Sequence, residues 1–195
     1  LLKIQAVFFR PEEPFTWASG IKSPVYCDNR LTLTAPEVRT HVENALAEVV
    51  RENYPDAEVL MGTSTAGIAH AAITAHILGM PMGYVRSGNK DHGRQNRIEG
   101  ADLLHVLLQQ RTGGQGRSGD ALREAGAVVL GIASIFTYSM QKGLDRLKEA
   151  ELKNISLTDF DHIAEVAAKN GYIKPEDIER LIKFRNNPSD ESWIK

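Results

Sequence analysis

The chain has 195 residues, of which 42% are hydrophobic and 25% are charged, a composition typical of one globular domain with a sizeable core. Its formal net charge of −2 excludes a general nucleic-acid binder, which needs an excess of Lys and Arg to replace phosphate counterions. The sequence shows no apolar run near the roughly 20 residues of a membrane span and no signal-peptide pattern, and its single cysteine, Cys27, excludes an internal disulfide. We therefore expect a cytoplasmic protein with a single domain over residues 1–195.

Two short β-type runs mark the N-terminal segment. The sequence PFTW covers residues 14–17, PVYC covers residues 24–27, and a turn containing Gly20 separates them. We expect these two runs to pair as a hairpin outside the main sheet. Residues 1–34 would then form part of a small hood over a substrate.

Helix and strand patterns alternate in the next part of the chain. Apolar residues at helical spacing predict a helix over residues 35–53, with Pro36 in its first turn. A short apolar strand over residues 58–61 leads into a helix over residues 66–80 that is expected to pack against a sheet. The sequence MGYVR, residues 82–86, has the character of a buried strand.

The alternation continues toward the C-terminus. Residues 119–126 predict a helix closed by Gly126, and the β-branched run over residues 127–138 predicts a long strand. A further strand is expected over residues 153–157. Strands that alternate with helices in this way predict the α/β class, with a mainly parallel sheet flanked by helices.

Two more helices are expected after the last strand. The first covers residues 158–172 and is capped by Thr158 or Asp159. Its apolar face is predicted to consist of Phe160, Ile163, Val166 and Ala167. The second covers residues 175–186, with Pro175 in its first turn.

Three loops that follow strands have compositions suited to anions. Residues 62–67 (GTSTAG) present hydroxyl and N–H groups at the start of a helix. Residues 84–100 (YVRSGNKDHGRQNRIEG) carry several cations, which suit a polyanion such as a diphosphate because multipoint hydrogen bonds to charged oxygens are strong. Residues 111–116 (RTGGQG) precede a helix and can wrap a phosphate monoester with backbone N–H groups.

Each of these loops also has an ordinary explanation. The first could be a βα turn with a helix cap, the second a charged loop that stays in water, and the third a flexible glycine-rich surface loop. In parallel sheets, however, ligands bind in the loops at the carboxyl ends of the strands. Three anion-suited loops at one such edge match the needs of a ligand with two phosphate groups and a sugar.

Several stretches together resemble the type I phosphoribosyltransferases, and the orotate phosphoribosyltransferases in particular. They are FFRPEEPFTWASGIKSPVYCDNR, GTSTAGIAHA, YVRSGNKDHGRQNRIEG, the TGG with its helix, and IFTY. The resemblance implies the type I phosphoribosyltransferase fold with an N-terminal hood. It also implies a Mg²⁺-dependent reaction in de novo pyrimidine (UMP) biosynthesis, in which orotate and 5-phosphoribosyl 1-diphosphate (PRPP) give orotidine 5′-monophosphate and diphosphate.

The resemblance also implies roles for individual residues. PRPP would be bound by residues of the three loops: Thr65, Ala66, Arg86, Lys90 and His92 at the diphosphate, and Thr112, Gly113 and Gly114 at the 5′-phosphate. The family is dimeric, so Lys90 and His92 would close from the partner subunit and act as the catalytic residues. Lys22 and Tyr26 of the hairpin would hold orotate by charge and ring contact.

One motif of the family is not matched. Relatives carry two adjacent residues, at least one of them Asp, that bind the ribose hydroxyls. Counting back from Thr112 puts Leu107 and Leu108 at these positions, and Arg111 stands where a small hydroxyl residue is expected. The segment over residues 101–119 is also several residues shorter than the family pattern, and Gly88 stands where relatives often carry another Lys.

Two explanations are open for the missing acids. Either the chain is a diverged relative that binds ligands with impaired turnover, or residues 101–119 are misread or frame-shifted. The intact hairpin and the intact cation-rich loop over residues 84–100, which we call the basic loop, indicate selection for activity. They therefore favour the explanation that residues 101–119 are misread or frame-shifted. Alternative functions are a non-catalytic or regulatory nucleotide-binding protein of the same fold, or a phosphoribosyltransferase for another base.

The remaining chemistry-bearing residues have structural interpretations. The sequence gives no metal-ligand spacing among His41, His70, His76, His105 and His162, so we expect helix-face or core histidines and predict no protein metal ligands. Cys27 is expected to be a packed thiol. Trp17 and Trp193 are expected to be packing residues.

Overall fold

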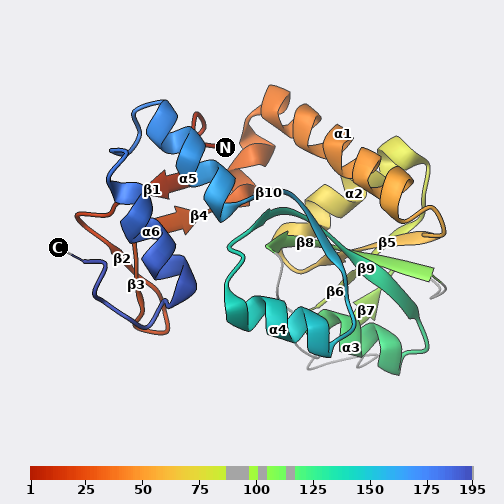
Figure 1. Ribbon diagram of the computed structural model, residues 1–195. Coiled ribbons are helices and arrows are strands. Elements are labelled where there is room, and N and C mark those ends of the chain that lie inside the picture. The colour runs from red at the N-terminus through yellow and green to blue at the C-terminus, as the bar shows by residue number, and fades with distance from the viewer. Residues whose placement is uncertain (87–96, 101–104, 113–116, 195) are drawn as a thin grey trace.

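The structure, a computed structural model, describes residues 1–86, 97–100, 105–112 and 117–194 (Figure 1). Its centre is a six-stranded sheet in the order β10-β9-β8-β5-β6-β7. All neighbouring strands in it run parallel except β6 and β7. The strands are β5 (Val59–Thr63), β6 (Met82–Val85), β7 (Ile98–Glu99), β8 (His105–Thr112), β9 (Val128–Thr137) and β10 (Asn154–Asp159). The predicted α/β class is confirmed.

Helices cover both faces of this sheet, as Figure 1 shows with α1 and α2 above it and α3 and α4 below. These helices are α1 (Pro36–Asn53), α2 (Ala66–Leu78), α3 (Arg117–Glu124) and α4 (Gln141–Glu149). Leu60 and Leu107 join the core beneath α1 and α2, while the next residues, Met61 and Leu108, join the core on the α3 side. This alternation follows from the two-residue period of a strand and explains why residues 59–61 of β5 and residues 106–108 of β8 are consecutive apolar residues.

A separate N-terminal unit lies against the C-terminal helices α5 (Phe160–Lys169) and α6 (Asp177–Asn186). We call residues 7–27 of this unit the hood. It contains two small antiparallel sheets, one pairing β1 (Val7–Phe9) with β4 (Val25–Cys27) and the other pairing β2 (Phe15–Thr16) with β3 (Lys22–Ser23). Between β4 and α1 the chain forms the 3-10 helix η1 (Asn29–Thr34).

The predicted pairing of residues 14–17 with residues 24–27 is wrong. The turn after β2 is tight, because the Trp17 N–H donates to the Ile21 carbonyl (2.9 Å) and Gly20 takes φ +85°, so Phe15 comes opposite Ser23. The run PVYC instead pairs with Val7–Phe9, a strand that the sequence analysis did not identify.

The helices also differ from the predictions in details. Helix α4 was not predicted, and Pro175 lies before α6 rather than in its first turn. On α5, Val166 was expected to face the core but is 50% exposed. Ala164, which was not expected there, is buried in the core instead. His105 begins β8 and is exposed, so it is neither a helix-face nor a core histidine. Trp193 and the Cys27 thiol are buried as expected.

A buried polar cluster fixes α2 against α1. The Glu43 carboxylate, fully buried on α1, accepts a hydrogen bond from the Thr74 hydroxyl (2.9 Å) and lies 2.5 Å from Nδ1 of the buried His70. Since Thr74 and His70 are one turn apart on α2, one carboxylate holds this helix at two points. The cluster therefore sets the position of the N-terminus of α2, where the first anion-suited loop lies.

Asp159, one of the two residues predicted to cap α5, is its N-cap and also contacts the His162 side chain. The carboxylate accepts from the His162 backbone N–H (2.9 Å) and lies 2.8 Å from His162 Nδ1. The hydrogen bond and charge of Asp159 raise the pKa of His162. Partial burial opposes ionisation of Asp159, but the hydrogen bonds from His162 outweigh it and lower the pKa of that carboxyl.

Because the folded-state pKa of His162 is raised, its stabilising contribution is complete below its ordinary pKa and is lost as the pH rises through the raised value. We therefore expect the melting temperature of the wild type to exceed that of His162→Gln by more at about pH 6 than at about pH 8. Calorimetric melting at both pH values measures this. Asp159→Asn should remove the same pH dependence, and an equal gap at both pH values would contradict the assignment.

Candidate active site

The loop between β5 and α2 lies at the carboxyl edge of the sheet. Strand β5 ends at Thr63, α2 begins at Ala66, and the exposed Thr65 is its N-cap residue. A Cβ at Gly62 would lie 2.8 Å from Ile68 Cα, so only glycine lets the strand pass this close to the start of the helix. The loop thus directs the free N–H groups of a helix N-terminus toward the edge, an arrangement that suits a diphosphate.

Arg86 lies beside this loop. It follows the last residue of β6, and the Ser64 N–H donates to the carbonyl of the preceding Val85 (2.9 Å). Its guanidinium is partly exposed, with Nη1 3.7 Å from a carboxylate oxygen of Glu99 on β7. One predicted diphosphate ligand and the predicted diphosphate loop are therefore neighbours. Lys90 and His92 lie outside the described residues.

The third loop leaves the sheet at the same edge. Thr112 is the last residue of β8, where its backbone pairs with Phe136 of β9, and α3 begins at Arg117. Strands β8 and β5 are adjacent and parallel, so the chain after Thr112 and the loop after Thr63 start from the same side of the molecule. Gly113 and Gly114 lie outside the described residues.

The hood borders this edge through an aromatic contact. Trp17, at the end of the β2–β3 hairpin, packs edge-on against Tyr138 with ring centroids 5.7 Å apart, and Tyr138 is the first residue after β9. The predicted packing role of Trp17 is therefore confirmed. In the hairpin, the Lys22 ammonium donates to the Thr16 hydroxyl (2.8 Å).

Tyr26 is on β4 and belongs to an aromatic group on the hood. Its ring is stacked on Phe8 (centroids 6.0 Å apart) and contacts Phe15 (5.7 Å), and the residue is 37% exposed. The Arg10 guanidinium lies 5.1 Å from the centroid of the Phe15 ring and places a second cation on the hood besides Lys22. Arg10 was not among the predicted site residues, and its only signal in the sequence is its position directly after Phe8 and Phe9.

Comparisons with known proteins were made on the whole chain. A scan against models of protein families found no match. The chain is 50% identical over 201 positions to the orotate phosphoribosyltransferase of Bacillus subtilis strain 168, covering all of this chain and 93% of the relative. The chain belongs to the orotate phosphoribosyltransferase family. The enzyme of that name from Listeria innocua is 48% identical over 203 positions, covering all of this chain and 95% of the relative.

A solved structure supports the same assignment. The crystal structure of orotate phosphoribosyltransferase from Aeropyrum pernix matches with a TM-score of 0.74 and 25% identity, covering 89% of this chain and 97% of that one. The type I phosphoribosyltransferase fold, which the resemblance implied, is thereby confirmed. Both alignments with the curated relatives span more positions than the 195 residues of this chain, so those relatives carry residues that it lacks.

Leu107 and Leu108 cannot serve as the acidic pair of an orotate phosphoribosyltransferase. Both are fully buried inside the sheet, on opposite faces of it. The residue of β8 that pairs with Gly62, next to the end of β5, is Gln109. By backbone pairing, residues 109 and 110, rather than 107 and 108, therefore lie level with the end of β5.

The described residues of this family member also bear on metal binding. They contain no group of three or more His, Cys, Asp or Glu side chains placed to hold an ion. Loops lined by N–H and hydroxyl groups attract anions, and Mg²⁺ commonly binds through substrate phosphates and water. Among the same residues, no helix combines the length and apolar character needed to cross a membrane.

Proposed function

We propose that the protein transfers the 5-phosphoribosyl group from PRPP to orotate, giving orotidine 5′-monophosphate and diphosphate. The main support for the proposal is structural. The Thr65 loop, Arg86 and the end of β8 lie at one edge of the sheet, beside the hood. Identity of 50% over the whole chain favours this activity over a non-catalytic relative. The reaction places the protein in pyrimidine biosynthesis, and we infer a cytoplasmic location from its single cysteine.

The proposed roles follow the charges of PRPP. The N–H groups at Thr65 and Ala66, together with Arg86, bind the diphosphate, and Thr112, Gly113 and Gly114 bind the 5′-phosphate. Lys90 and His92 bind the diphosphate from the partner subunit of a homodimer. As the bond between C1 of the ribose and the diphosphate oxygen breaks, negative charge develops on the diphosphate, and these cations stabilise it.

The other substrate needs a cationic site beside the reacting carbon. Lys22 on the hairpin supplies a charge for the orotate carboxylate, and Tyr26 offers a ring face to the pyrimidine. Bound Mg²⁺ would supply further charge neutralisation on the diphosphate oxygens. Closure of the basic loop over the site would keep water from the electrophilic ribose.

Formation of orotidine 5′-monophosphate tests the proposal. Purified protein with Mg²⁺, PRPP and orotate is expected to release diphosphate only when all three are present. Uracil and adenine in place of orotate should give less than about one hundredth of that rate, because neither carries the carboxylate that pairs with Lys22. Orotate binding without any diphosphate release would contradict the proposal and favour a binding protein of the same fold.

A further inference from the structure

We propose that Arg180 is a positioning residue for the orotate site, because it fixes the loop between β1 and β2 of the hood to the C-terminal helix α6. The inference deepens the proposed function and rests on it, since it assumes that Lys22 of the hood meets orotate. Arg180 itself is expected to touch no substrate. It acts through the backbone that carries the hairpin.

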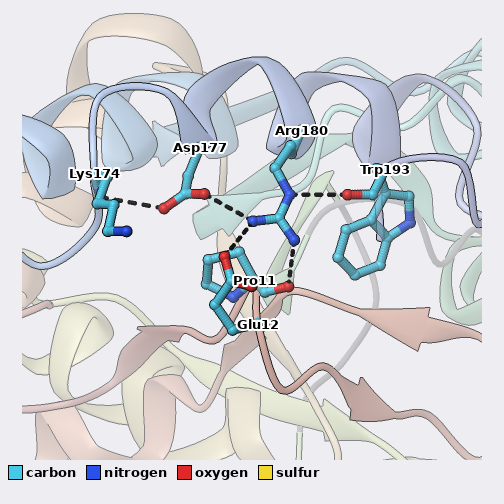
Figure 2. A network of polar contacts seen from close by, with 6 residues as sticks. All are labelled: Pro11, Glu12, Lys174, Asp177, Arg180 and Trp193. Atoms are coloured by element: carbon cyan, nitrogen blue, oxygen red, sulfur yellow. Dashed lines mark hydrogen bonds and ion pairs between the residues drawn. The ribbon is translucent and has the colours of Figure 1, made fainter. Parts of the chain in front are cut away.

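One guanidinium joins three segments of the chain (Figure 2). Arg180 Nη1 donates to Glu12 Oε1 (2.6 Å) and to Asp177 Oδ1 (2.9 Å), and Nη2 donates to the Pro11 carbonyl (2.8 Å). Its Nε donates to the Trp193 carbonyl (2.9 Å). The residue is only 7% exposed, so water competes little for these bonds.

The charges show that the contacts to the hood do more than neutralise a buried cation. Asp177, 3% exposed and on the same helix, already pairs with Arg180, and its other oxygen accepts from the Lys174 N–H (3.3 Å). Glu12 is exposed, so its carboxylate would be well solvated without the arginine. The bonds to Glu12 and to the Pro11 carbonyl therefore add directional contacts that specify where this loop lies.

The loop that Arg180 holds is directly connected to the proposed substrate residues. Its N-terminal end is fixed because the Arg10 N–H donates to the Pro24 carbonyl (2.7 Å). Its C-terminal end is β2, where Thr16 pairs with Lys22 in the backbone and accepts a hydrogen bond from the Lys22 ammonium (2.8 Å). A shift of the loop at Glu12 would therefore move the Lys22 side chain.

A second contact would keep the hood attached if the Arg180 bonds were lost. Trp17 packs edge-on against Phe184 of α6, with ring centroids 5.8 Å apart. Because this apolar contact is independent of the guanidinium, loss of Arg180 should shift the loop at Pro11 and Glu12, and with it the start of β2, without releasing the hood. The expected defect is thus one of orotate binding rather than of folding.

Arg180→Lys is the informative variant. Lysine keeps the charge beside Asp177 but has no planar group that can reach Glu12, Pro11 and Trp193 together. We expect the KM for orotate to rise about tenfold, while kcat and the KM for PRPP stay within about twofold. The matched control is Arg185→Lys, because Arg185 is on the same helix but pairs with Asp161 of α5 (3.2 Å) and not with the hood. It should leave all three constants within about twofold of the wild type.

A readout without turnover separates this inference from the proposed function. Amide hydrogen exchange over residues 15–23 is expected to be faster in Arg180→Lys than in Arg185→Lys, at a temperature where both are folded. Equal exchange in this segment would overturn the inference, and so would an equal rise of both KM values. If the wild type forms no product, the proposed function is wrong, and the exchange comparison still decides whether Arg180 fixes the hairpin.

Discussion

Aspartates in place of Gln109 and Gln110 are expected to raise kcat for orotidine 5′-monophosphate formation by about 100-fold over the wild-type chain. The backbone of Gln109 pairs with Gly62 next to the end of β5, so the backbone at these two positions lies level with the edge where we propose that the ribose of PRPP binds. Carboxylates there can accept hydrogen bonds from the ribose hydroxyls and offset the positive charge that develops on the sugar. Steady-state kinetics at saturating PRPP and orotate measure the effect.

In the matched control, aspartates replace Leu107 and Leu108 instead. These are the positions that counting back from Thr112 assigns to the acidic pair of the family. Both leucines are fully buried, and an unpaired buried carboxylate costs several kcal/mol, so this variant is expected to unfold. Two such costs approach the whole stability of a domain, about 5–15 kcal/mol. Circular dichroism distinguishes the two variants. If the variant with aspartates at 107 and 108 is folded and more active than the wild type, the assignment of the acidic positions to residues 109 and 110 is wrong.

Lys90→Ala is expected to lower kcat by about a thousandfold while the KM for orotate stays within about twofold. The proposed role of Lys90 is to stabilise charge that appears on the diphosphate only in the transition state, and orotate does not meet this charge in the ground state. Lys148→Ala, at the C-terminal end of α4, is the control and should match the wild type. Initial rates over a grid of PRPP and orotate concentrations give both constants. Equal losses in kcat and in orotate affinity would contradict this role.

Much of the fold could be predicted because it depends on local patterns. Helix α1 and strand β5 were predicted from the spacing of apolar residues, and parallel order followed from the alternation of strands and helices. The same order predicts that the loops after β5, β6 and β8 start from one edge, and the structure confirms this for Thr65, Arg86 and Thr112. The binding roles of these residues stay predictions.

The errors arose where distant residues decide the outcome. The run PVYC had two possible partners, and the tight turn closed by Gly20 left it free to pair with Val7–Phe9. The error at Val166 was instead a local one, because this residue comes six positions after Phe160 and turns away from the apolar face, whereas Ala164, four positions after Phe160, lies on it. The contacts of Arg180 with Pro11 and Glu12 join opposite ends of the chain, and no local pattern signals such pairs.

The register of β8 shows a further limit of counting along a motif. Counting from Thr112 assumes that the chain between the acids and the glycines has the length found in relatives. The backbone pairing of β8 with β5 does not depend on that assumption, and it places residues 109 and 110 level with the end of β5. In a chain that is shorter than its relatives, strand pairing therefore locates the end of a strand more directly than counting along a motif.

A crystal structure of the protein with Mg²⁺ and PRPP tests the account most directly. The diphosphate is expected within hydrogen-bonding distance of the N–H groups at Thr65 and of the Arg86 guanidinium, with the 5′-phosphate at residues 112–114. PRPP bound away from this edge, or with its two ends exchanged between the two loops, would contradict the account.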